Sequence, residues 1–289
     1  MKTLVAIFIS LRPPQWTKNL IVFVALIFSK NLLVGPRFLL SLIAFCIFCF
    51  ISGAIYIFND LLDREFDKLS PKKSGRPIAS GKLNPKTAFL FAFLLMVASL
   101  IVALKINTVF FLVCLLYAAI QILYSVSLKH IVIIDVFCIA VGFVLRLIAG
   151  AVAIDVAVSS WFILCTMLIS LFLALSKRRS ELLLTINHHN VRPVLKEYSS
   201  RFLDQAISLV SSATVISYAL YTLSHETIAK FHTANLIYTI PFVLYGVLRY
   251  LYLVYKRQAG DEPELLLLTD KALILNIVLY ILSVFVILY

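Results

Sequence analysis

The chain has 289 residues, of which 62% are hydrophobic and only 14% carry a charge, and its mean hydropathy is +1.01. Soluble domains contain about 25% charged residues, so this composition excludes a soluble protein and indicates an integral membrane protein. The net charge of +12 would suit a nucleic acid, but the sequence contains no nucleic-acid-binding module. We therefore expect membrane lipids and phosphate-bearing substrates as partners, and no nucleic acid.

The chain begins with an apolar stretch, Met1 to Leu11, that is too short for a signal peptide and is interrupted by Arg12-Pro13-Pro14. We expect an interfacial helix here, with Trp16 at the depth of the lipid headgroups. Nine apolar stretches near the ~20 residues needed to cross a bilayer follow. They predict an all-α, polytopic membrane protein with a single domain over residues 1–289. The nine predicted spans are 19–36, 38–58, 87–104, 108–126, 131–153, 158–176, 205–223, 235–255 and 271–289.

The positions of the basic residues predict the orientation, because Lys and Arg are retained in cytoplasmic loops. A cytoplasmic N-terminus places most of the 26 Lys and Arg residues inside, and nine spans then place the C-terminus outside. The two longest loops, Asp60 to Lys86 and Lys177 to Asp204, face the cytoplasm in this arrangement. We expect the functional groups on the cytoplasmic side of the cell (inner) membrane.

An acidic motif follows the second predicted span. If the helix continues past Phe58, then Asp60, Asp63 and Asp67 lie at i, i+3 and i+7 and share one face. Hard carboxylate oxygens favour Mg²⁺, which is commonly shared between carboxylates and a substrate's phosphates. With Asn59 beside them, the three acids predict a site for Mg²⁺ and a diphosphate. The alternative is an acidic helix end balanced by Arg64 and Lys68.

A basic loop follows directly, with the sequence Lys72-Lys73-Ser74-Gly75-Arg76-Pro77-Ile78-Ala79-Ser80-Gly81. Cations placed above the carboxylates would neutralise phosphate oxygens that the metal does not reach. The alternative interpretation is an ordinary basic cytoplasmic loop.

The motif Asn59-Asp60-x-x-Asp63-x-x-x-Asp67, followed by Arg76-Pro77-Ile78-Ala79-Ser80-Gly81, resembles the first aspartate-rich motif and loop of the UbiA superfamily of intramembrane prenyltransferases. This resemblance implies nine helices around a central cavity that opens to the cytoplasmic side, and a Mg²⁺-diphosphate site. Members that prenylate aromatic acceptors usually carry a second motif of D-x-x-x-D type in the later long loop. This chain has Ser176-Lys177-Arg178-Arg179-Ser180-Glu181 there instead, which disfavours aromatic prenylation.

Further segments resemble a branch of the superfamily that moves 5-phosphoribose from 5-phosphoribosyl 1-diphosphate to a polyprenyl phosphate. The charge balance agrees with this branch, because two phosphate-bearing substrates require more cations than a prenyl diphosphate and a neutral ring. The matching segments are Arg12 to Asn19, Tyr124 to His130 with Asp135, Arg146 with Gly150, Lys177 to Glu181, and Arg249-Tyr250 with Gly260 to Glu264.

The resemblance implies Asp60, Asp63 and Asp67 as metal-binding catalytic residues. Arg146 lies inside a predicted span, where a charge usually faces a cavity or a partner. Arg146 and Asp135 are about three helical turns apart and cannot touch, so they either line the cavity or bind backbone or other side chains in a structural role. The expected substrate-binding residues are Asn59, Gln15, Lys18, Arg64, Lys73, Arg76, Tyr124, Lys129, Asp135, Arg146, Lys177, Arg178, Arg179 and Glu181.

Two other functions remain open at this point. One is prenyl transfer from a polyprenyl diphosphate to an aromatic or other small acceptor, which the missing second acidic motif disfavours. The other is transport of a phosphorylated solute, which the position of the acids at one membrane surface disfavours, since transporter sites usually lie near mid-membrane. A homo-oligomer is compatible with the sequence.

Overall fold

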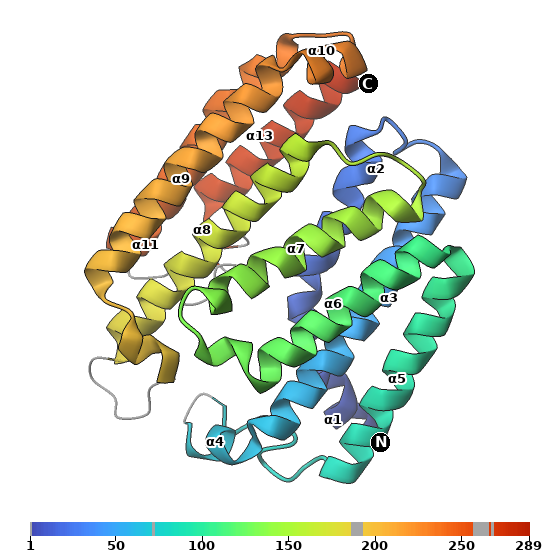
Figure 1. The fold of residues 1–289 in the computed structure, drawn as a ribbon, viewed down its shortest axis with the longest axis vertical. Helices are drawn as coiled ribbons and strands as arrows, with labels where there is room; N and C mark the ends of the chain where they lie inside the picture. Colours follow the sequence, from blue (N-terminus) through green and yellow to red (C-terminus); the bar gives the residue numbers. More distant parts are fainter. Residues whose placement is uncertain (1, 71–72, 186–192, 257–265, 267–268) are drawn as a thin grey trace. The chain divides into compact units, whose positions relative to one another are not determined.

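The computed structural model describes residues 2–70, 73–185, 193–256, 266 and 269–289. This part of the chain consists of helices joined by turns and contains no strand (Figure 1), which confirms the predicted all-α class. It divides into two compact units, Met1–Val158 and Ser159–Tyr289. That the whole chain acts as a single domain stays a prediction.

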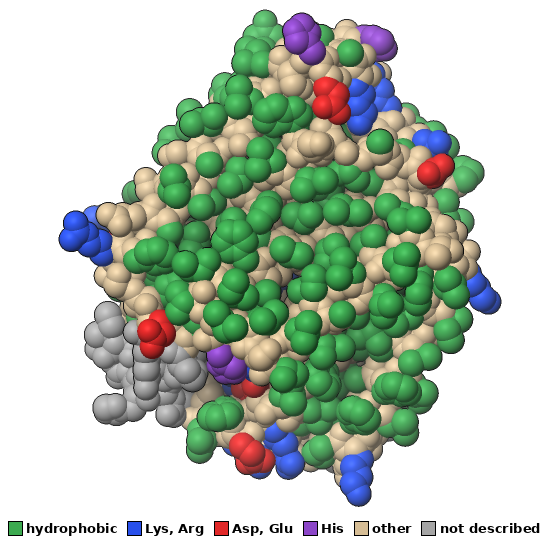
Figure 2. Space-filling model, viewed as in Figure 1, with side chains coloured by type: hydrophobic (Ala, Val, Ile, Leu, Met, Phe, Trp, Pro, Cys, Tyr) green, Lys and Arg blue, Asp and Glu red, His purple; other side chains and the backbone are tan. Residues whose placement is uncertain are grey.

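Within the described residues, eight helical segments are long and apolar enough to cross a membrane. Hydrophobic side chains cover most of the face shown in Figure 2, and many large apolar residues are exposed along these helices. Such a surface is stable in lipid and not in water, so the protein is an integral membrane protein. The eight segments are Gly35–Leu62, Pro85–Ile106, Thr108–Val126, Ile134–Ala153, Ser160–Leu184, Ser200–Leu223, Asn235–Lys256 and Lys271–Leu288.

The predicted first span, 19–36, differs from the structure, and the predicted count of nine is not confirmed. A 3-10 helix, η1 (Pro13–Phe23), leads into a short α-helix, α2 (Val24–Phe28). Pro13 and Pro14 cannot donate backbone hydrogen bonds, and the first turn of η1 begins with them. A 3-10 helix rises about 2.0 Å per residue, so η1 and α2 together reach about 30 Å, near the thickness of the hydrocarbon core.

The first unit contains α1 (Lys2–Ser10), η1, α2, α3 (Gly35–Leu62), α4 (Arg64–Leu69), α5 (Pro85–Ile106), α6 (Thr108–Val126), η2 (Leu128–His130) and α7 (Ile134–Ala153). Helix α3 packs against α5 and α6, and η1 packs against both α3 and α7. The ring of Phe48 on α3 lies 5.2 Å from that of Tyr117 and 6.3 Å from that of Phe110 on α6, measured between centroids. These rings form the centre of the core of this unit.

Helix α1 exposes Leu4, Val5, Phe8 and Ile9. The ring of Trp16 lies edge-on against Phe8, with centroids 6.3 Å apart. This exposed apolar row supports the prediction of an interfacial helix, since its burial in the bilayer surface would remove it from water.

The second unit contains α8 (Ser160–Thr185), η3 (Pro193–Glu197), α9 (Ser200–Leu223), α10 (His225–Phe231), η4 (Asn235–Thr239), α11 (Ile240–Lys256) and α13 (Lys271–Leu288). Helices α8 and α9 pack along one another, and α11 packs against α13. Tyr218 hydrogen-bonds to Thr239 at 2.6 Å and to Tyr280 at 3.2 Å. Hydrogen bonds between hydroxyl groups satisfy polar atoms that would otherwise be unpaired in lipid.

Helix starts follow local sequence signals in both units. A side chain at the N-cap accepts a backbone hydrogen bond and satisfies one of the unpaired N–H groups of the first turn. The residues that do so are Asn84 for α5, Asn107 for α6, Ser199 for α9, Ser224 for α10 and Asp270 for α13.

Candidate active site

The acidic motif lies where α3 ends. Helix α3 continues past Phe58 to Leu62, and α4 begins at Arg64. Asp63 joins them with φ −89° and ψ 6°, yet Asp63 N–H still donates to Asn59 O at 2.9 Å and Asp67 N–H to Asp63 O at 2.8 Å. The predicted helical spacing of the three acids therefore persists across a bend.

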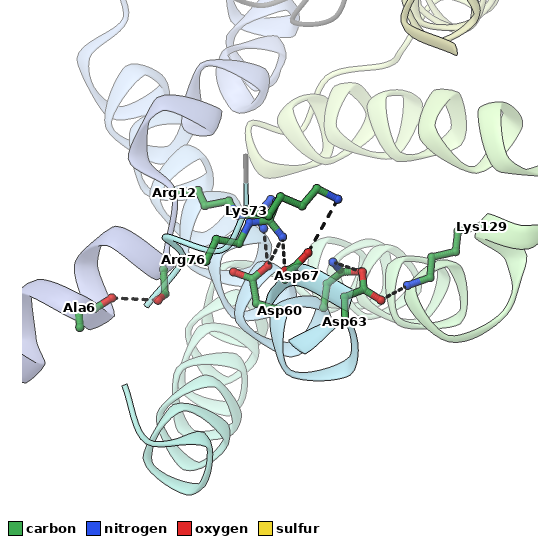
Figure 3. Close-up of polar contacts among 10 residues, drawn as sticks. Ala6, Arg12, Asp60, Asp63, Asp67, Lys73, Arg76 and Lys129 are labelled. Atoms are coloured by element: carbon green, nitrogen blue, oxygen red, sulfur yellow. Dashed lines mark hydrogen bonds and ion pairs between the residues drawn. The ribbon is translucent and has the colours of Figure 1, made fainter. Parts of the chain in front are cut away.

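Asp60 and Asp67 are 2% exposed and are joined by the guanidinium group of Arg76 (Figure 3). Arg76 Nη1 donates to Asp60 Oδ1 at 3.0 Å and to Asp67 Oδ2 at 2.6 Å. Arg12 Nη2 also donates to Asp60 Oδ1, and Lys73 Nζ lies 3.8 Å from Asp67 Oδ1. Three cations thus neutralise the two buried carboxylates, because buried charges require opposite charges close by.

Asp63 points to other partners. Lys129 Nζ donates to Asp63 Oδ1 at 2.7 Å, and Asn59 Nδ2 donates to Asp63 Oδ2 at 3.1 Å. Among the described residues, no three Asp, Glu, His and Cys side chains lie close enough together to hold a metal ion. Arg76 instead contacts both Asp60 and Asp67, and Lys129 contacts Asp63.

The donor set nevertheless fits Mg²⁺ in its chemistry. Asp60, Asp63 and Asp67 supply only hard carboxylate oxygens, which Mg²⁺ prefers. The cationic Arg76 Nη1 contacts one oxygen of Asp60 and one of Asp67, so both carboxylates already attract positive charge. Binding of a metal there requires Arg76 to move away from the carboxylates.

The acids at the end of α3 are not balanced by Arg64 and Lys68, the alternative that the sequence left open. Both cations pair with the exposed Glu65, with Lys68 Nζ at 2.8 Å and Arg64 Nε at 3.9 Å from Glu65 Oε1. The hydrogen bond from Lys68 lowers the pKa of Glu65. The structure therefore places Arg64 beside Glu65, apart from the pairs that Asp60 and Asp67 make.

The basic loop is folded back on itself, which holds Arg76 in place. Ser80 N–H donates to Arg76 O at 2.8 Å, and Leu83 N–H donates to Pro77 O at 2.9 Å. Gly81 has φ +77°, a backbone conformation that glycine adopts without steric cost. Ile78 and Leu83 are fully buried and anchor the loop below Arg76. Lys72, predicted within this loop, lies outside the described residues.

Arg12 is a site residue that we did not predict as one. It adopts the left-handed conformation, with φ 54° and ψ 61°, between α1 and η1. Its guanidinium contacts Asp60 and lies 4.9 Å from the centroid of the Tyr56 ring, a distance typical of a cation–π interaction. The signal was present in the segment Arg12 to Asn19, but sequence alone does not bring Arg12 to Asp60.

A second polar cluster lies deeper in the same unit, around Arg146 on α7. This residue is 5% exposed and donates to Asn19 Oδ1 at 2.7 Å, Gly142 O at 3.0 Å and Tyr117 OH at 2.6 Å. These bonds join η1, α6 and α7. Asn19 was not among the predicted site residues, and it is the partner that ties Arg146 to η1.

The remaining predicted residues of this unit lie on neighbouring elements. Asp135 is fully buried in the first turn of α7, and its predicted proximity to the cavity stays a prediction. The partly buried residues are Gln15 and Lys18 on η1 and Tyr124 on α6.

In the second unit, the cations that replace the second acidic motif lie on the last turns of α8. Arg178, 2% exposed, donates to Glu181 Oε2 at 2.6 Å. Arg179 Nε donates to Asp204 Oδ1 at 2.5 Å, and its guanidinium lies 4.1 Å from the Tyr255 ring. Glu181 is therefore an ion-pair partner of Arg178, and Lys177 is partly buried beside them. The segment Gly260 to Glu264 lies outside the described residues.

Comparison with known proteins connects this site to a family. The model of the UbiA prenyltransferase family matches residues 19–277, which include the acidic motif, the basic loop and the cations of α8. The chain belongs to the UbiA prenyltransferase family. Family membership confirms the resemblance that the acidic motif and its loop predicted.

Two curated relatives of this UbiA chain are decaprenyl-phosphate phosphoribosyltransferases. The protein from Mycolicibacterium smegmatis is 33% identical over 276 residues, which cover 91% of this chain and 86% of the relative. The protein from Corynebacterium glutamicum is 34% identical over 273 residues, which cover 91% of this chain and 81% of the relative.

A solved structure also shares the UbiA fold. A UbiA homolog from Archaeoglobus fulgidus bound to GPP and Mg²⁺ superimposes with a TM-score of 0.73 at 22% identity, covering 98% of this chain and 99% of that one. At this identity the likeness supports the fold of both units and leaves the site chemistry to the residues themselves.

Proposed function

We propose that this UbiA-family protein transfers 5-phosphoribose from 5-phosphoribosyl 1-diphosphate to a polyprenyl phosphate and releases diphosphate. The observation that carries the proposal is the buried pair Asp60 and Asp67 with cations on both sides. Similarity over 91% of the chain to decaprenyl-phosphate phosphoribosyltransferases supports the choice of donor and acceptor. The three cations of α8, in place of a second pair of acids, suit a phosphate-bearing acceptor.

Asp60, Asp63 and Asp67 would hold Mg²⁺, with Asn59 orienting Asp63. When bound, the metal would neutralise the charge that the departing diphosphate gains. The carboxylates lie at the end of a membrane helix, so a diphosphate can approach them from the aqueous side while a lipid tail stays among apolar helices.

Arg12 and Arg76 would take over the phosphate oxygens. In the structure both guanidinium groups are bound to carboxylates. With Mg²⁺ on the carboxylates, Arg12 and Arg76 would lose these partners and would donate charge-assisted hydrogen bonds to the oxygens of the diphosphate. The cations would therefore exchange carboxylate partners for phosphate partners without leaving the site.

The acceptor needs no strong general base. The second pKa of a phosphate monoester is about 6, so most of the acceptor carries two negative charges at neutral pH and can attack the ribose carbon directly. As that bond forms, the bond from carbon to the diphosphate oxygen breaks. The protein would contribute mainly positioning and charge neutralisation.

The positive-inside distribution supports a location in the cell membrane with the N-terminus, the acidic motif and its loop in the cytoplasm. The segment formed by η1 and α2, together with the eight long helices, would give nine crossings and an external C-terminus. Cytoplasmic acids and cations would then meet a soluble, charged donor from the aqueous side of the membrane.

The test uses purified protein in detergent with Mg²⁺, radiolabelled 5-phosphoribosyl 1-diphosphate and a polyprenyl phosphate, and follows label into the organic phase. Asp60→Asn and Asp67→Asn should each lower Mg²⁺-dependent transfer by more than about 100-fold, since even residues that only support metal ligands cost 10–100-fold. Asp155→Asn is the matched control, because Asp155 is an exposed acid of the same unit.

Thermal unfolding of each variant should confirm that the chain remains folded. The proposal is wrong if wild-type protein transfers no phosphoribose but releases diphosphate from a prenyl diphosphate in the presence of an aromatic acceptor. That result would establish prenyl transfer instead.

A further inference from the structure

The helix η1 sorts its side chains into three rows. A 3-10 helix has 3.0 residues per turn, so residues at i and i+3 lie directly above one another. One row is buried and contains Asn19 and Val22, and another exposes Pro14 and Leu20. The third row contains Gln15 and Lys18, which are both partly buried. Gln15 and Lys18 thus lie one above the other along η1.

This polar row starts at the acidic motif. Gln15 N–H donates to Arg12 O at 2.8 Å, so the row begins one turn after Arg12, whose guanidinium contacts Asp60. With a rise of about 2.0 Å per residue, Gln15 lies about 6 Å and Lys18 about 12 Å further along the helix axis. An α-helix would rotate the two residues away from one another by about 60°. The 3-10 geometry keeps them on one line.

The other end of η1 is pinned, which explains why so long a 3-10 helix persists. Runs beyond three or four residues are uncommon because their hydrogen bonds are poorly aligned. Asn19 accepts from Arg146 Nε at 2.7 Å and donates to Ser52 Oγ at 3.3 Å. At Val22 the backbone of η1 touches α7, since a Cβ atom added to Gly150 would lie 2.1 Å from Val22 O.

We infer that Gln15 and Lys18 form a subsite for the sugar-phosphate half of the donor, aligned with the acidic motif by the 3-10 geometry of η1. The inference rests on the proposed function, which places the diphosphate half at Asp60 and Asp67. Lys18 supplies a point charge for a phosphate monoester, and the amide of Gln15 both donates to and accepts from ribose hydroxyl groups.

Arg146 is a positioning residue in this subsite. Its hydrogen bond to Asn19 fixes the helix that carries Gln15 and Lys18, and its buried guanidinium contacts the residue next to Lys18 in the chain. The electrostatic interaction of a positive charge is stronger at a given distance in a low-dielectric region than in water. Arg146 therefore adds to the attraction that an anion experiences at Lys18.

The test compares two ligands that share the diphosphate group but differ in the sugar phosphate. Affinities of 5-phosphoribosyl 1-diphosphate and of pyrophosphate are measured by titration calorimetry with Mg²⁺ and without acceptor. Wild-type protein should bind the sugar diphosphate more tightly than pyrophosphate. Lys18→Met should lower the affinity for the sugar diphosphate by about tenfold or more, the value of one charge-assisted hydrogen bond. It should change the affinity for pyrophosphate by less than about twofold.

Two variants serve as controls. Lys18→Arg keeps the charge and should restore most of the affinity. Lys105→Met makes the same substitution at an exposed lysine in the last turn of α5 and should change neither affinity. A thermal unfolding curve for Lys18→Met shows whether the variant is folded.

If Lys18→Met weakens the binding of both ligands equally, the inference is overturned, because Lys18 would then contact the diphosphate. No preference of the wild type for the sugar diphosphate, or no effect of Lys18→Met, would overturn it as well. Farnesyl phosphate, a short polyprenyl phosphate, can be titrated as an analogue of the acceptor. If Lys18→Met weakens its binding and leaves donor binding unchanged, Gln15 and Lys18 belong to the acceptor site and the inference is overturned. Failure of the proposed function is detected separately, because the transfer assay would then show no label from the donor in the organic phase.

Discussion

Lys129 Nζ lies 2.7 Å from Asp63 Oδ1, although the two residues are 66 positions apart in the chain. The turn that follows Lys129 is strained. Ile133 has φ +70°, which is rare for a β-branched residue, and Ile134 N–H donates to Val132 O at 2.8 Å, the pattern of a γ-turn. Strained turns of this kind occur at functional sites. Here the turn joins the segment that carries Lys129 to the start of α7.

Replacing Lys129 with Met should make it easier for Mg²⁺ to bind. If Asp63 is a metal ligand, as proposed, Lys129 would compete with Mg²⁺ for it, and a partly exposed ion pair contributes about 0.2–1 kcal/mol. The Mg²⁺ concentration that gives half of the maximal donor binding should therefore fall by up to about fivefold. Titration of Mg²⁺ at fixed donor concentration measures this. Lys86→Met is the control, and an unchanged or higher Mg²⁺ requirement for Lys129→Met would contradict the prediction.

Replacing Gly150 with Ala should destabilise the first unit and weaken donor binding. The new methyl group would lie 2.1 Å from Val22 O, and backbone atoms cannot yield as a flexible side chain does. Such overpacking costs about 1–3 kcal/mol and would displace η1 together with Lys18. Thermal unfolding and donor titration measure the two effects. Gly35→Ala is the matched control, because no atom lies within 4 Å of the added Cβ, and equal behaviour of both variants would refute the contact.

Protonation of Asp270 at low pH should make the second unit less stable. Asp270 caps α13 by accepting from Leu273 N–H and pairs with Arg249 at 2.8 Å, and the hydrogen bond from Arg249 lowers the pKa of Asp270. A carboxyl group with a lowered folded-state pKa stabilises the protein above its unfolded pKa of about 3.9. This contribution is lost as the pH falls through the folded-state pKa.

The variant Asp270→Asn retains the capping oxygen and removes only the charge. It should unfold more readily than wild type at pH 7, by about 1 kcal/mol or less, and the difference should disappear as the pH is lowered below about 4. Thermal unfolding in detergent across this pH range measures the difference. A difference that is constant with pH would show that the charge of Asp270 contributes nothing.

Much of the fold was predictable because membrane spans depend on composition. A bilayer demands about 20 apolar residues in a row and internal backbone hydrogen bonds, so eight predicted spans correspond to observed helices. The remaining span, 19–36, is not confirmed, because this segment does not form one long α-helix. Its hydropathy suits a span, but Pro13 and Pro14 begin a 3-10 helix that Arg146 and Gly150 then hold in place, and hydropathy carries no information on that geometry.

The sequence by itself determined the class of protein, the membrane helices and the position of the acidic motif at the end of α3, since these depend on neighbouring residues. Only the tertiary structure decided the partners of the acids. Arg12, Arg76 and Lys129 lie 48, 16 and 66 positions from the carboxylates that they contact. Which cation reaches which acid depends on how separate helices pack and where turns direct the chain, and spacing along the sequence does not encode it.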